Sequence, residues 1–133
     1  MTFFLDTNIC INFLVGKNPP LLNKIMSFNP NDIKIPAIVK AELIHGAEKS
    51  IKRDENHVKI CAFLLPFEII PFDSAGADCY GKIKATLEKK GMLIGPNDLI
   101  IAATALARNA ILVTDNTNEF NRVEGLVMEN WIH

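Results

Sequence analysis

The chain has 133 residues, of which 49% are hydrophobic, and its formal net charge is −1. This length predicts a single domain over residues 1–133 with a sizeable core. The near-neutral balance argues against a general polyanion binder, so any nucleic-acid contact must come from a local patch.

The chain opens with an apolar run over residues 2–5, too short for a helix, which ends in the polar residues Asp6, Thr7 and Asn8. Such a run predicts a strand that is covered on both faces. Asp6 then lies at the carboxyl end of the strand, where open α/β sheets bind ligands. Alternatively, Asp6 or Asn8 only caps a helix over residues 9–15, because Asp and Asn are preferred at that position. Further acids at the carboxyl end of this strand would favour a ligand-binding role for Asp6 over a helix cap alone.

Strands and helices are expected to alternate along the rest of the chain, with Trp131 packed against the body. Apolar patterns predict helices over residues 21–28, 36–49, 56–65, 73–90 and 99–108, and strands over residues 33–35, 67–72, 110–114 and 126–128. In the helix over 36–49, an apolar stripe at helical spacing consists of Ile38, Ala41, Ile44 and Ala47. This alternation favours an α/β fold, with a central, mostly parallel sheet of about five short strands between helices.

Cysteine and histidine usage argues against a disulfide framework and a zinc site. The cysteines are odd in number and fall in apolar helical patterns, which is typical of buried, reduced thiols. They are Cys10, Cys61 and Cys79, and the scattered histidines are His45, His57 and His133. No apolar run approaches the roughly 20 residues of a membrane span. We expect a soluble, cytoplasmic protein.

Carboxylates from distant parts of the chain are expected at one edge of the sheet. If the first and fourth strands are neighbours that lead away in opposite directions, Asp6 and Asp115 meet at their carboxyl ends. Asp98 begins the helix that feeds the fourth strand, Glu42 projects from an earlier helix, and Glu119 follows shortly after the fourth strand. Singly, Glu42 and Glu119 could be solvated, and Asp98 could interact only with a helix dipole.

Such a cluster implies a divalent cation. Several carboxylates in one cleft repel each other and raise their own pKa values unless a cation lies among them. Oxygen ligands without Cys or His favour Mg²⁺, with Mn²⁺ as a substitute, over Zn²⁺. A cation with open positions can activate water and neutralise charge on a phosphodiester. The sequence is consistent with a site for one ion and with a site for two.

Seven short motifs, each weak alone, are specific through their order and spacing. They are LDTNICI (5–11), AEL (41–43), GAEKS (46–50), YGKI (80–83), GPNDLIIAA (95–103), VTDNTNEF (113–120) and ENW (129–131). With these motifs the chain resembles, nearly end to end, the PIN-domain family of metal-dependent ribonucleases. Within that family it is similar to the VapC-type toxins of bacterial toxin–antitoxin pairs.

The resemblance implies a PIN-like α/β/α sandwich and a Mg²⁺-dependent endoribonuclease. Such toxins cleave RNA, often tRNA, and the nearest subgroup cuts initiator tRNA in the anticodon stem-loop, which inhibits translation. By matching positions, Asp6 and Asp98 are the main metal ligands and Glu42 completes the acidic pocket. Family members place the fourth acid at one of two positions, here Asp115 or Glu119, and we favour Asp115 because it ends the strand.

The same resemblance implies positioning residues and partners. Side chains expected to position ligands or phosphate are Thr7, Asn8, Thr114 and Asn116. Independently of the resemblance, the basic residues Lys82 and Lys84 are expected to contact the RNA backbone. The expected partner is a small antitoxin, whose C-terminal tail occupies the active-site groove and whose N-terminal part binds operator DNA. A homodimer is also expected.

Two other functions use an acid after the first strand. A haloacid-dehalogenase-type phosphatase needs a second Asp two residues on, where this chain has Asn8, and it is the alternative to the nuclease. A receiver-type signalling domain needs an acidic pair close to the first strand and a late lysine, and neither is evident. A dinucleotide-binding domain needs GxGxxG, which the chain lacks.

Overall fold

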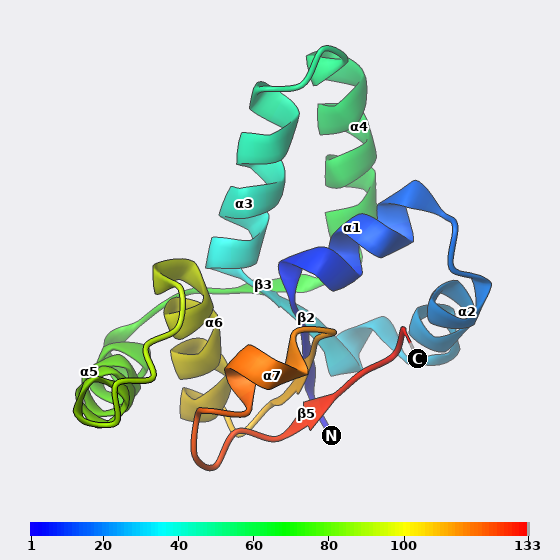
Figure 1. The fold of residues 1–133 in the computed structure, drawn as a ribbon. Coiled ribbons are helices and arrows are strands. Elements are labelled where there is room, and N and C mark those ends of the chain that lie inside the picture. The colour runs from blue at the N-terminus through cyan, green and yellow to red at the C-terminus, as the bar shows by residue number, and fades with distance from the viewer. Residues whose placement is uncertain (133) are drawn as a thin grey trace.

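The structure is a computed structural model that describes residues 1–132, and His133 lies outside the described residues. Strands and helices alternate along the chain (Figure 1). The strands are β1 (Phe3–Leu5), β2 (Ile33–Pro36), β3 (Glu68–Ile70), β4 (Ile111–Val113) and β5 (Met128–Glu129). The helices are α1 (Thr7–Val15), α2 (Pro19–Ser27), the 3-10 helix η1 (Pro30–Asp32), α3 (Ala37–Glu48), α4 (Arg53–Leu64), α5 (Ser74–Lys89), α6 (Pro96–Ala107) and α7 (Thr117–Phe120).

The five strands form one parallel sheet in the order β3-β2-β1-β4-β5. The chain passes from β1 to β2 and β3 on one side, and the later strands β4 and β5 lie on the other side. The order of connections therefore reverses between β1 and β4, whose register pairs Leu5 with Val113. The first and fourth strands are neighbours, which is the condition under which Asp6 and Asp115 were expected to meet, and the sheet is wholly rather than mostly parallel.

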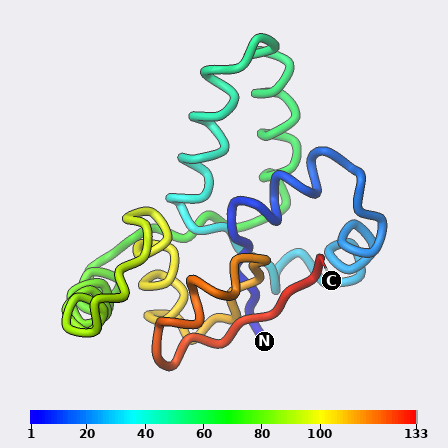
Figure 2. Tube along the Cα trace, viewed as in Figure 1, coloured from blue at the N-terminus to red at the C-terminus, as the bar shows by residue number. Residues whose placement is uncertain are grey.

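Helices flank the sheet and bury its central strand, whereas the edge strands β3 and β5 are partly exposed. In Figure 1, α3 and α4 form a hairpin that projects from the sheet, and Figure 2 follows the chain up α3 and back down α4. All three residues of β1 are buried, as expected for a strand covered on both faces. Across the helices described over residues 1–132, none combines the length and apolarity that a membrane crossing needs.

An aromatic cluster fixes the end of the described chain against the body. Trp131 stacks on Phe28 with ring centroids 5.1 Å apart, and Phe3 of β1 lies 4.8 Å from Phe28 and 5.1 Å from Trp131. The predicted packing of Trp131 is therefore confirmed. Offset and tilted aromatic pairs add stabilisation beyond the area that they bury.

Several element boundaries differ from the expected ones. The helix α1 begins two residues early because Asp6 itself is its N-cap. The helix α4 begins at Arg53 because Asp54 and Glu55 favour a helix start ahead of the apolar pattern. The last strand shifts to Met128–Glu129. The short elements η1 and α7 were not predicted, since pieces of three or four residues show no periodicity.

The predicted apolar stripe of α3 was partly correct, because Ala47 is buried and Ile38 and Ile44 pack against the core, but Ala41 does not. The buried residues of this helix are Val39, Leu43 and Ala47, whereas Ala41 is exposed. Apolar residues occupy two adjacent faces of this helix, and contacts with β2 and α4 decide which of them is buried.

The expectation of three buried thiols was wrong. Cys10 is buried, but Cys61 is exposed on α4 and Cys79 is half-buried on α5. Both residues lie on helices with a solvated face, and periodicity alone did not place them correctly.

Replacing Leu112 by Ala tests the packing of the strand that leads into the acidic edge. Leu112 is fully buried in β4, so we expect Leu112→Ala to lower the free energy of unfolding by about 2–5 kcal/mol. The control is Val127→Ala, because Val127 is 58% exposed and its truncation should change stability by no more than about 0.5 kcal/mol. Urea unfolding measures both, and equal losses would contradict the buried position of Leu112.

Candidate functional site

Asp6 lies at the carboxyl end of β1 and is 5% exposed. Its Oδ1 accepts a hydrogen bond from the backbone N–H of Thr7 at 2.8 Å, and its Oδ2 accepts one from the Thr114 hydroxyl at 2.7 Å. Burial raises the pKa of Asp6, and these hydrogen bonds lower it in part. The nearby charges of Glu42 and Asp115 raise the pKa of Asp6 further. Asp6 therefore caps α1 and also faces other acids.

Thr114 joins the ends of the two central strands. Its side chain is fully buried, and its hydroxyl donates to Asp6 while accepting from the backbone N–H of Asn116 at 3.0 Å. The backbone N–H of Asp6 donates to the carbonyl oxygen of Val113 at 2.9 Å. These bonds fix the carboxylate of Asp6 relative to the turn after β4.

Asp98 and Glu119 form a second part of the site. Asp98 is half-buried in the first turn of α6. Glu119 lies on α7, where its Oε1 accepts the backbone N–H of Gly95 at 2.7 Å and its Oε2 accepts the side-chain amide of Asn116 at 2.8 Å. Glu119 is thus held by one donor that precedes α6 and one that precedes α7.

Electrostatics couple these two acids to the rest of the cluster. Burial, followed by the charge of Glu119 and a hydrogen bond with it, raises the pKa of Asp98 to about 7. The charges of Asp6 and Glu42 act in the same direction. The pKa of Glu119 is lowered, first by the N–H of Gly95. The proximity of Glu119 therefore favours the protonated form of Asp98.

Glu42 reaches the site from α3. Its Oε1 accepts the hydroxyl of Thr7 at 2.7 Å, and its Oε2 accepts the side-chain amide of Asn97 at 3.5 Å. The reading of Glu42 as a freely solvated acid is therefore wrong. The acids come from the start of α1, from α3, from the start of α6 and from the segment around α7, elements that Figure 1 labels, and their charges act on one another.

Asp115 follows Thr114 at the end of β4 and is half-buried. Its Oδ1 is buried and has no hydrogen-bond partner among the described residues. An unpaired buried oxygen costs free energy, and the charge of Asp115 also raises the pKa of Asp6. This oxygen is available to a cation.

The donor set fits a hard divalent cation. All five acids, Asp6, Glu42, Asp98, Asp115 and Glu119, supply only oxygen ligands, which Mg²⁺ and Mn²⁺ prefer. Within residues 1–132, no three such side chains already enclose a point where an ion could be held. Most of their oxygens instead face hydroxyl, amide and backbone donors, which an ion would have to replace in part.

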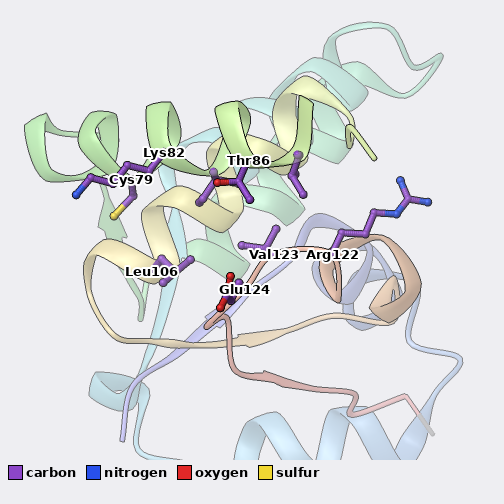
Figure 3. Close-up of a pocket in the computed structure, with 9 residues that line it drawn as sticks. Cys79, Lys82, Thr86, Leu106, Arg122, Val123 and Glu124 are labelled. Carbon is purple, nitrogen blue, oxygen red and sulfur yellow. The ribbon is translucent and has the colours of Figure 1, made fainter. Parts of the chain in front are cut away.

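The predicted lysines lie apart from the acids. Lys82 lines a pocket beside α5 (Figure 3), and Lys84 places its Nζ 5.7 Å from the centre of the Tyr80 ring. Among the described residues, no hydrogen bond or ion pair joins either lysine to the acidic cluster. Asn8 is exposed beside Asp6.

Sequence reasoning missed three residues that support the site. Gly95 and Asn97 contact Glu119 and Glu42, and Arg122 donates to the carbonyl oxygen of Leu93 in the loop that leads to α6. The first two precede Asp98 in the GPND motif, which was a usable signal. Arg122 follows Glu119 by three residues, and nothing in the sequence pattern marked it.

The model of the family described as PIN domain matches residues 3–126. The chain belongs to the PIN-domain family. It is 44% identical over 133 residues to Ribonuclease VapC2 of Rickettsia felis, with 98% of each chain covered. It is 39% identical over 131 residues to a protein of Shigella flexneri named tRNA(fMet)-specific endonuclease VapC, again with 98% of each covered.

Solved structures show the same architecture for this PIN-domain chain. VapBC2 from Rickettsia felis, bound to a promoter DNA fragment, gives a TM-score of 0.93 at 42% identity, covering 98% of this chain and 99% of that one. DNA-bound VapBC from Salmonella typhimurium gives 0.93 at 35% identity, with 98% of each covered. The resemblance to VapC-type ribonucleases is confirmed, and the phosphatase, receiver and dinucleotide-binding alternatives are set aside.

Replacing Asp98 by Asn tests the electrostatic strain in the site. The pKa of Asp98 is raised from 3.8 to about 7, so the folded state holds this proton more tightly than the unfolded state. The contribution of Asp98 to the free energy of unfolding is therefore largest below pH 3.8 and declines as the pH rises from 3.8 to about 7. In EDTA, we expect Asp98→Asn to have a higher Tm than the wild type at pH 8, and this difference in Tm should be clearly smaller at pH 5.

Circular dichroism melts at the two pH values measure this difference. Glu88→Gln on the exposed side of α5 is the matched carboxylate control and should change neither melt. A wild type that is more stable than Asp98→Asn at pH 8 in EDTA would contradict the raised pKa.

Proposed function

We propose that this PIN-domain chain is a Mg²⁺-dependent endoribonuclease that acts as the toxin of a toxin–antitoxin pair and cleaves tRNA. The observation that carries the proposal is the convergence of five carboxylates from separate elements at the carboxyl ends of β1 and β4. Membership in the family and the names of the relatives agree with hydrolysis of RNA.

Asp6, Asp98 and Asp115 are the proposed metal ligands, and Glu42 and Glu119 complete the acidic pocket. When bound, Mg²⁺ or Mn²⁺ supplies a Lewis acid that activates water and offsets charge on the phosphate. Without a cation, this cluster would repel an RNA backbone, because like charges in a low-dielectric pocket interact strongly. The carboxylates alone therefore do not suit a polyanionic substrate.

Hydroxyl and amide groups orient these acids. Thr114 fixes Oδ2 of Asp6, Thr7 fixes Oε1 of Glu42, and Asn116 fixes Oε2 of Glu119. Such supporting contacts hold ligands in the orientation that the chemistry requires. Asn8 is exposed beside Asp6 and is the proposed contact for a substrate phosphate.

The proposed substrate is initiator tRNA, cut in the anticodon stem-loop. The Shigella flexneri relative is named for its action on tRNA(fMet). Unpaired loops expose backbone and bases that a protein can separate from the stack. The half-buried Glu42 and Asp98 make the pocket reachable for such a loop, and Lys82 and Lys84 are proposed to contact RNA farther from the cut.

The decisive experiment follows cleavage of a synthetic initiator anticodon stem-loop with an elongator stem-loop beside it. We expect cleavage with Mg²⁺ or Mn²⁺, none in EDTA, and a loss of about 100-fold or more in Asp6→Asn and Asp98→Asn. Asp115→Asn should weaken Mn²⁺ binding more than Glu119→Gln, because both oxygens of Glu119 already have protein donors.

Glu88→Gln serves again as the carboxylate control and should cleave at the wild-type rate. Undiminished cleavage by Asp6→Asn would refute the proposed site. Equal cutting of both stem-loops would refute only the choice of initiator tRNA.

The proposed protein partner is an antitoxin whose tail lies in an apolar groove next to the acids. Three of the solved relatives are VapBC structures, two of them with bound DNA. A groove of about 410 Å³ runs between α1, α3 and α4, and Glu42 lines it as well as the acidic cluster. A tail seated there would reach the acids, and the antitoxin would provide the contact with operator DNA. A homodimer stays a prediction.

Replacing Val15 by Glu tests this groove. Val15 lines it and is 57% exposed, so an added carboxylate should weaken antitoxin binding by roughly tenfold or more through desolvation and repulsion from Glu42. Isothermal titration measures the affinity, and RNA cleavage by the free variant reports on folding. Val127→Glu, at a site 58% exposed and outside the groove, is the control. Unchanged affinity in Val15→Glu would place the tail elsewhere.

A further inference from the structure

The loop between α5 and α6, residues 90–95, supports two of the acids through Gly95. The N–H of Gly95 donates to Glu119, and its carbonyl oxygen accepts the N–H of Leu99 at 2.9 Å, which fixes the turn that carries Asp98. A Cβ on Gly95 would lie 3.5 Å from Oδ2 of Asp98 and 3.6 Å from Oε1 of Glu119. Any shift of this backbone would therefore disturb both carboxylates.

The middle of the loop has few other attachments. The N–H of Met92 bonds to the carbonyl oxygen of Leu87 at the end of α5, at 2.9 Å. Met92 and Leu93 are 43% and 50% exposed, and Ile94 is buried. Within the part of the chain that the structure describes, one side-chain hydrogen bond reaches residues 92–94, from Nη1 of Arg122 to the carbonyl oxygen of Leu93 at 3.0 Å.

Arg122 belongs to the same turn as Glu119, since its backbone N–H donates to the carbonyl oxygen of Glu119 at 3.2 Å. This turn therefore contacts the loop at two points. Glu119 accepts the N–H of Gly95, and Arg122 donates to the carbonyl oxygen of Leu93. Arg122 also lines a pocket of about 250 Å³ with Lys82 and Cys79, and Figure 3 shows its guanidinium extending away from both of them. The guanidinium is thus directed out of the pocket.

We propose that Arg122 is a positioning residue of the nuclease: its bond to Leu93 locks the loop before α6 and so keeps Asp98 and Glu119 in place. The inference rests on the proposed metal-dependent function for its catalytic consequence. A guanidinium presents five N–H donors in a rigid fork, so it can hold a carbonyl group in a defined place. An exposed guanidinium could alternatively bind a substrate phosphate, and the two roles predict different measurements.

The test compares Arg122→Gln and Arg122→Lys with Glu124→Gln, which changes another residue on the wall of the same pocket. We expect amide hydrogen exchange of residues 92–95 to accelerate about tenfold in Arg122→Gln. Mn²⁺ affinity should fall roughly tenfold, and kcat on the stem-loop should fall while KM stays constant. Arg122→Lys should recover part of each loss, since an ammonium can still donate to Leu93, and Glu124→Gln should match the wild type.

Binding of the stem-loop in an Asp6→Asn background separates positioning from phosphate contact. If Arg122→Gln weakens RNA binding tenfold while loop exchange and Mn²⁺ affinity stay at wild-type values, Arg122 binds phosphate and the positioning role is overturned. If wild type cleaves no RNA with any divalent ion, the proposed function fails. Faster loop exchange and weaker Mn²⁺ binding in Arg122→Gln would still support the positioning role.

Discussion

The parallel pairing of β1 with β4 is the constraint on which the acidic cluster depends. It places residues from the beginning and the end of the chain at one edge of the sheet, where the order of connections reverses. The buried hydroxyl of Thr114 then ties Asp6 to the turn after β4. Because these groups are fixed by backbone pairing and burial, the carboxylate of Asp6 has little freedom to turn toward solvent.

Gathering acids at this edge opposes folding. The raised pKa values of Asp6 and Asp98 both express the cost of ionised carboxylates that are desolvated and close to one another. Donors from Thr7 and Thr114 offset part of this cost but leave the net charge unchanged. A divalent cation would offset the remainder, so the strain in the folded protein and the affinity for a cation have the same origin.

The features predicted correctly from the sequence are those that depend on local residue patterns. The buried strands and the acids that follow them were evident from short apolar runs ending in polar residues, whereas the pairing of the first strand with the fourth entered only as a condition that the structure fulfils. Other features come from tertiary contacts that leave no periodic trace, such as the choice of buried face on α3 and the bond from Arg122 to Leu93. Gly95 lies between these cases, because its motif was evident but its N–H contact with Glu119 was not.

The structure distinguishes Asp115 from Glu119 as candidates for the fourth acid, a choice that the sequence leaves open. Both follow β4, yet Glu119 has protein donors on both of its oxygens, whereas Oδ1 of Asp115 is buried with no donor among residues 1–132. A carboxylate engaged by neutral donors gives up those bonds when it coordinates an ion, whereas an unpaired buried oxygen gains a partner. This argument supports the proposal that Asp115 rather than Glu119 is a metal ligand, whereas the contact of Glu119 with Asp98 raises the pKa of Asp98.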